Sequence, residues 1–82
     1  MVDNIEFTSG GVPYTLNRKQ VERMMKGKAP GRVHTHVVVI NDVLYPVKEA
    51  YAHVLGRDSL DFNTQEARSV FKRLGFPLRR VS

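Results

Sequence analysis

Cysteine is absent from this chain of 82 residues. Its absence excludes disulfides, thiolate metal sites and a cysteine nucleophile, and it suits a reducing compartment such as the cytoplasm. Long apolar runs are missing as well. The longest, VVVI at residues 37–40, is far shorter than the roughly 20 residues that cross a membrane. The first residues, MVDNIEF, lack the basic and apolar regions of a signal peptide. We therefore expect a soluble, cytoplasmic protein.

Acidic residues are few relative to basic ones, because 13 Lys and Arg stand against 8 Asp and Glu and give a net charge of +5. The basic residues gather in two segments. Residues 17–32 hold six bases and one acid, and residues 64–82 hold five bases and one acid, whereas residues 1–16 hold two acids and no base. Such clustering favours a polyanionic partner.

Two β-hairpins are predicted. Residues 4–16 place β-prone runs on either side of Ser-Gly-Gly, and Pro13 is typical of an edge strand. Residues 33–47 contain a β-branched run that is interrupted at Asn41-Asp42, a pair that favours a tight turn.

A first helix is predicted between these hairpins. Asn17 is the expected N-cap, Gln20 completes a capping box, and Gly27 is the expected stop. The stripe predicted to be buried consists of Val21, Met24 and Met25.

Two further helices follow the second hairpin. We expect the first of them to begin at Pro46 and to end at Gly56. Its apolar residues recur at helical spacing and are Val47, Ala50, Tyr51 and Val54. The last helix begins after an Asn63 cap and ends at Gly75, with Ala67, Val70, Phe71 and Leu74 as its apolar stripe. "FPLRRV" is either a final strand or an ordered tail. We predict one α+β domain over residues 1–82, its last two helices packed in a helix-turn-helix-like pair.

The outer face of the last helix is the main candidate for function. Its side chains recur at i, i+3, i+4 and i+7 and include no acid; they are Gln65, Arg68, Ser69 and Lys72. Arg reads guanine, Gln reads adenine, and Lys and Ser contact phosphates, so such a helix can lie in a major groove. An ordinary solvated face is the alternative. We add Asn63 and Thr64 at the start of this helix to the predicted DNA-binding surface.

A basic ridge on the first helix could flank the same DNA backbone. It consists of Lys19, Arg23 and Lys26, which lie at i, i+4 and i+7. The three histidines, His34, His36 and His53, suggest a metal site only weakly, and surface histidines are the preferred interpretation. No catalytic constellation is apparent. We expect a non-catalytic binding module that has neither metal nor cofactor.

Residues 37–76 resemble the N-terminal head domain of McrA-type modification-dependent HNH endonucleases and of related small actinobacterial proteins. That pattern is a hairpin ending in Tyr-Pro-Pro-Lys, a helix, and then Phe and Thr before a helix that ends in Leu-Gly-Phe. The matching positions are Tyr45, Pro46 and Lys48, then Phe62, Thr64, Ala67 and Arg68, and finally Leu74, Gly75 and Phe76.

One position departs from the pattern, because Val47 replaces its second proline. The HNH nuclease motif is absent. The resemblance therefore implies DNA recognition without cutting, in a restriction-modification setting, with modified bases suggested by the domains it accompanies.

Lys48 is mildly unfavourable in the first turn of a helix, where the macrodipole favours an acid. It could bind a phosphate together with free helix N–H groups. It could equally be a solvated lysine, or could pack its stem on Tyr45 and reach a carboxylate such as that of Asp61. The resemblance, in which this lysine recurs, favours the phosphate.

We predict a small basic protein that binds double-stranded DNA, as a regulator or a reader of modified DNA, and that is nucleoid-associated if this holds. A nuclease or other protein partner in trans and a homodimer are both compatible with that prediction. The alternative is a protein-interaction or assembly module with a basic face for an acidic partner. RNA binding is less favoured, because no aromatic-rich sheet for stacking bases is apparent.

Overall fold

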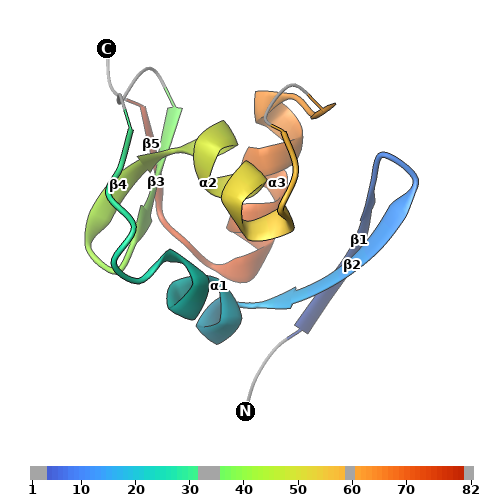
Figure 1. The fold of residues 1–82 in the computed structure, drawn as a ribbon, viewed down its shortest axis with the longest axis horizontal. Coiled ribbons are helices and arrows are strands. Elements are labelled where there is room, and N and C mark those ends of the chain that lie inside the picture. Colours follow the sequence, from blue (N-terminus) through green and yellow to red (C-terminus); the bar gives the residue numbers. More distant parts are fainter. Residues whose placement is uncertain (1–3, 32–35, 59–60, 81–82) are drawn as a thin grey trace.

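The computed structural model describes residues 4–31, 36–58 and 61–80. The expected α+β fold, with two hairpins and three helices, is confirmed (Figure 1). The elements in chain order are β1 (Asn4–Ser9), β2 (Val12–Asn17), α1 (Arg18–Met25), β3 (His36–Ile40), β4 (Val43–Pro46), α2 (Val47–Leu55), α3 (Thr64–Leu74) and β5 (Leu78–Arg80).

Both hairpins close with two-residue turns of left-handed backbone. Gly10 and Gly11 have φ of 59° and 80°, and Asn41 and Asp42 have φ of 54° and 63°. Positive φ at both central positions matches the twist of antiparallel strands, and Gly, Asn and Asp are the residues that tolerate it. The predicted positions of both turns are therefore confirmed.

Two separate sheets result. β1 and β2 form a two-stranded sheet, and the second sheet has the order β4-β3-β5, with β5 antiparallel to β3. The "FPLRRV" segment thus supplies a strand. In Figure 1, α2 and α3 lie between the three-stranded sheet and the β1–β2 hairpin, and α1 lies below them.

One core fills the space between these layers. Val38, Ile40 and Tyr45 face it from the three-stranded sheet, and Tyr51 and Phe71 face it from α2 and α3. Rings meet there edge to face, with 4.5 Å between the centroids of Tyr51 and Phe62. The same phenol ring lies 6.2 Å from Phe7, so the hairpin packs on the aromatic centre of the core.

The first residue of α2 differs from the expected one. Pro46 pairs with Val37 as the last residue of β4 and is the N-cap of a helix that begins at Val47. Its φ of −56° and ψ of 131° keep it extended, because it still belongs to the strand. The predicted ends at Gly56 and Gly75 are confirmed, with φ of 68° and 89°.

Gly27, the predicted stop of α1, has left-handed backbone (φ 78°) and follows the C-cap residue Lys26. The helix stops at Met25, and Lys26 has extended backbone (ψ 127°). Side chains from later in the chain take the carbonyls at this end. The Tyr45 hydroxyl lies 3.2 Å from the carbonyl oxygen of Met25 and 2.8 Å from that of Lys28, and His53 Nε2 lies 3.1 Å from that of Met24.

Met24 was wrongly assigned to the core. Val21 and Met25 face the interior at i and i+4 and are fully buried, whereas Met24 is 37% exposed. A helix of two turns presents a narrow apolar stripe, and Met24 falls at its edge.

Candidate functional site

The outer face of α3 has the arrangement that its sequence predicts. Ala67, Val70, Phe71 and Leu74 are buried, and the opposite side chains are exposed. Asn63 caps the helix through Oδ1, which accepts from the N–H of Glu66 at 2.8 Å, and Thr64 is half-buried. We call the exposed set the α3 outer face; it consists of Gln65, Arg68, Ser69 and Lys72.

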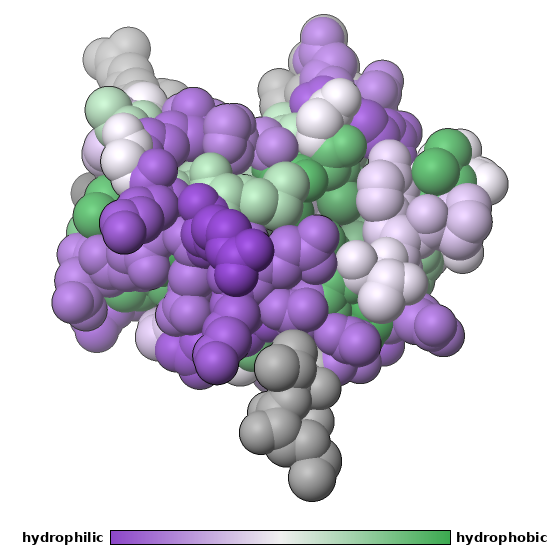
Figure 2. All heavy atoms as spheres, turned by 60° about the horizontal axis from the view of Figure 1, so that its bottom comes forward, coloured by the Kyte–Doolittle hydropathy of each residue, from purple (hydrophilic) through white to green (hydrophobic). Residues whose placement is uncertain are grey.

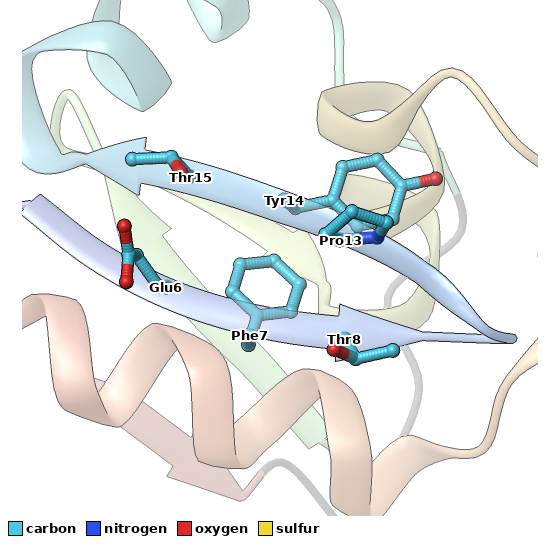
Figure 3. A pocket seen from close by; sticks show the side chains of 6 residues that line it. All are labelled: Glu6, Phe7, Thr8, Pro13, Tyr14 and Thr15. Carbon is cyan, nitrogen blue, oxygen red and sulfur yellow. The ribbon is translucent and has the colours of Figure 1, made fainter.

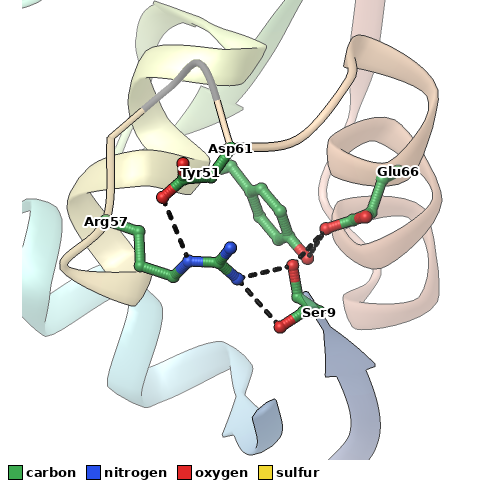
Figure 4. Close-up of polar contacts among 5 residues, drawn as sticks. All are labelled: Ser9, Tyr51, Arg57, Asp61 and Glu66. Atoms are coloured by element: carbon green, nitrogen blue, oxygen red, sulfur yellow. Dashed lines mark hydrogen bonds and ion pairs between the residues drawn. The ribbon is translucent and has the colours of Figure 1, made fainter. Parts of the chain in front are cut away.

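Glu66, the one acid in α3, turns toward the interior (Figure 4). Its Oε2 accepts from the hydroxyl of Ser9 at 2.5 Å and from the hydroxyl of Tyr51 at 2.9 Å. Ser9 is 1% exposed and Tyr51 is fully buried. The carboxylate therefore joins β1, α2 and α3 and leaves the α3 outer face without an acid.

Arg57 completes this polar cluster from the end of α2. Its Nη1 donates to the carbonyl oxygen of Ser9 at 2.9 Å and to Ser9 Oγ at 3.0 Å, and its Nε lies 3.5 Å from Asp61 Oδ2 (Figure 4). A Cβ at Gly10 would lie 2.5 Å from Arg57 Nη2, so a larger residue there would also have to displace the Arg57 guanidinium. This cluster could not be predicted from local sequence patterns, because its members come from four separate segments.

Tyr51 carries a pH dependence that can be measured. Burial, and then the hydrogen bond to Glu66, raise the pKa of its hydroxyl above the ordinary 10.0. The folded state therefore holds this proton more tightly than the unfolded state does. We expect the stability that this group contributes to be complete below pH 10 and to be lost progressively above it. Urea unfolding between pH 9 and 11 measures how steeply the free energy of unfolding falls with pH. Tyr51→Phe should make this fall less steep. An equally steep fall in the variant would show that Tyr51 is not the group responsible.

Lys48 lies half-buried at the second position of α2. Asp61, named above as one possible carboxylate partner of Lys48, pairs with Arg57. Within the described residues Lys48 makes no ion pair. Glu49 follows it in the same first turn, and Glu49 Oε1 accepts from the N–H of Gly31 at 3.1 Å. This end of α2 therefore already holds one carboxylate.

The basic ridge of α1 is shorter than predicted. Lys19 and Arg23 are exposed on the helix, but Lys26 lies beyond its end. Figure 2 shows hydrophilic side chains gathered over this part of the molecule. Together with Asn17 and Gln20, the two cations line a shallow hollow of about 360 Å³.

Arg18 links α1 to α3. Its Nη1 donates to the carbonyl oxygen of Gly75 at 3.3 Å, and its guanidinium lies 5.0 Å from the ring centroid of Phe76. Its Nε also lies 3.6 Å from Glu22 Oε2. The start of α1 is thereby held against the end of α3.

A second shallow hollow lies on the β1–β2 hairpin (Figure 3). Tyr14 at its border stacks on Phe7 with centroids 5.6 Å apart. This supports local packing as the role of Tyr14.

No group of three or more potential metal ligands occurs in the part of the chain that the structure describes, and His34 lies outside it. None of the helices described is long and apolar enough to cross a membrane.

Fold and surface together define a small α+β domain with a cationic outer helix and no acid on that helix face. The chain belongs to the SCO5918-like family, whose model matches residues 10–82. No curated protein and no solved structure matches it.

Proposed function

We propose that this protein binds double-stranded DNA through the α3 outer face and catalyses no reaction itself. One observation carries the proposal. Every side chain of that face is exposed and neutral or cationic, while the single carboxylate of α3 is directed into the fold by Ser9 and Tyr51.

The dimensions of α3 suit a groove. Its 11 residues extend about 16 Å at 1.5 Å each, and the major groove of B-DNA is about 12 Å wide. Arg68 and Gln65 lie one turn apart and can reach adjacent base edges, while Lys72 and Ser69 can contact phosphates. Asn63, Thr64 and Lys48 are assigned flanking contacts, with Lys48 the weakest of them because Glu49 adjoins it.

The resemblance to McrA-type head domains supports a modified duplex as the preferred target. It also supports a nuclease or another protein acting in trans. Both remain proposals that rest on the matching positions in residues 37–76.

Fluorescence anisotropy with labelled duplexes, unmodified and cytosine-methylated, tests the proposal over a salt series. Each phosphate contact contributes about 0.9 to the log–log salt slope. We expect Lys72→Ala to reduce the slope by about one and Arg68→Ala to weaken binding roughly tenfold or more, which corresponds to one lost guanine or phosphate contact. Tighter binding of the methylated duplex would support a reader of modified DNA.

Arg79→Ala is the matched control, because it removes the same charge from the other side of the molecule. Arg79 pairs with Val37 on β3, whereas the neighbouring pair Val38 and Leu78 faces the core and the helices. Arg79 therefore points away from α3. If Arg68→Ala and Arg79→Ala weaken binding equally, the α3 outer face is not the contact surface. If no duplex binds at low salt, the acidic-protein partner becomes the preferred hypothesis.

A further inference from the structure

The hollow on α1 is a positively charged concavity outside the α3 outer face. Two cations and two amide side chains line it, from Asn17, Lys19, Gln20 and Arg23. The amide of Asn17 is already engaged, since its Oδ1 accepts from the N–H of Gln20 at 2.8 Å and its Nδ2 donates to Asn4 Oδ1 at 3.1 Å. The cations of Lys19 and Arg23 and the side-chain amide of Gln20 remain to bind a ligand, and the two cations make that ligand an anion.

These two cations are without an acidic partner in the part of the chain that the structure describes. Glu22, the one acid of α1, pairs with Arg18. Like charges at i and i+4 destabilise a helix by tenths of a kcal/mol, roughly. An anion placed between Lys19 and Arg23 would remove that repulsion.

The position of the hollow relative to α3 is fixed by contacts already described. Arg18 precedes Lys19 and bonds the carbonyl oxygen of Gly75, the residue that ends α3. The whole chain measures 31 × 29 × 20 Å. One turn of duplex extends about 34 Å, so a single duplex spans every dimension of the protein.

We infer that the hollow formed by Lys19 and Arg23 is a second contact for the phosphodiester backbone of the duplex that the α3 outer face binds. The inference rests on the proposed function and deepens it. Arg18 is the positioning residue that keeps the two contacts at a constant separation. Lys26, which the sequence pattern placed on the same ridge, has no part in it because it lies beyond the helix.

Anisotropy with a 20-base-pair duplex tests this with two double variants of equal charge. Lys19→Ala/Arg23→Ala removes both cations of the hollow, and Arg79→Ala/Arg80→Ala removes two exposed cations from β5. We expect Lys19→Ala/Arg23→Ala to reduce the slope of log affinity against log salt by about two. At 0.1 M salt it should weaken binding roughly tenfold or more relative to Arg79→Ala/Arg80→Ala. Thermal unfolding should show both variants folded, because all four side chains are exposed.

Failure of the inference is distinguishable from failure of the proposed function. If Arg68→Ala weakens binding and the α1 double variant merely matches the β5 double variant, the hollow is not a contact and the α3 outer face stands. If only the α1 double variant weakens binding, the two-contact arrangement is overturned and α1 alone binds DNA. If Arg68→Ala and the α1 double variant both bind as well as their β5 controls, the inference and the proposed function are both overturned.

Discussion

Glu66→Ala should lower the free energy of unfolding by about 3 kcal/mol. The substitution leaves the hydroxyl protons of Ser9 and Tyr51 without their acceptor inside the protein, and a buried donor without a partner costs about 1–3 kcal/mol. This loss of stability is larger than that of a typical surface substitution, because the two hydroxyls are buried and because their bonds to Glu66 connect α3 to β1 and α2. One side chain therefore holds three elements together.

Urea denaturation measures this effect. Gln65→Ala is the control, because Gln65 is the exposed neighbour on the same helix turn and should change stability by less than about 0.5 kcal/mol. Glu66→Gln keeps one carbonyl acceptor and should give an intermediate loss. Equal stability of the Glu66→Ala and Gln65→Ala variants would show that the carboxylate does not accept these bonds.

Phe71→Ala should cost still more, about 3–5 kcal/mol. Phe71 is fully buried, and its ring makes edge-to-face contacts with Tyr51 and Phe76 at centroid distances of 6.0 Å. A domain of this size has a total stability of about 4–12 kcal/mol at 0.05–0.15 kcal/mol per residue. The variant should therefore be largely destabilised and melt well below the parent.

Ser69→Ala provides the comparison for this core variant. It lies on the same helix at an exposed position, and alanine is the better helix former, so its stability should match or slightly exceed that of the parent. Differential scanning calorimetry of the two variants distinguishes loss of the core from a change in helix propensity. A small shift for Phe71→Ala would contradict the central position of this ring.

Short-range patterns in the sequence were sufficient to predict most of the helices, strands and turns. Asn17 and Asn63 cap their helices as predicted, and the pairs Gly10-Gly11 and Asn41-Asp42 form the turns. These features depend on neighbours within a few residues, so a pattern in one short window specifies them. The composition of the α3 outer face was predictable for the same reason, because helical spacing decides which side chains are opposite the core.

Contacts between distant segments explain what the sequence did not predict. The last carbonyls of α1 bond to Tyr45 and His53, which come from later in the chain. The inward turn of Glu66 depends on Ser9, 57 positions away. The Asn63 cap engages only the backbone N–H of Glu66, and the packing of β1 against α3 reveals the partners of its carboxylate.

The pairing of β5 with β3 has a consequence for how the chain assembles during synthesis. Each hairpin can close as soon as its second strand has emerged, because its two strands are adjacent in the chain. Val38 of β3 cannot pair with Leu78 of β5 until β5 has been synthesised. Because the two residues are far apart in the chain, this pairing also requires α2 and α3 to be ordered first. Throughout that interval β3 presents an open edge beside apolar side chains such as Val37 and Val39. The nascent chain is therefore most prone to aggregate in the interval before β5 leaves the ribosome.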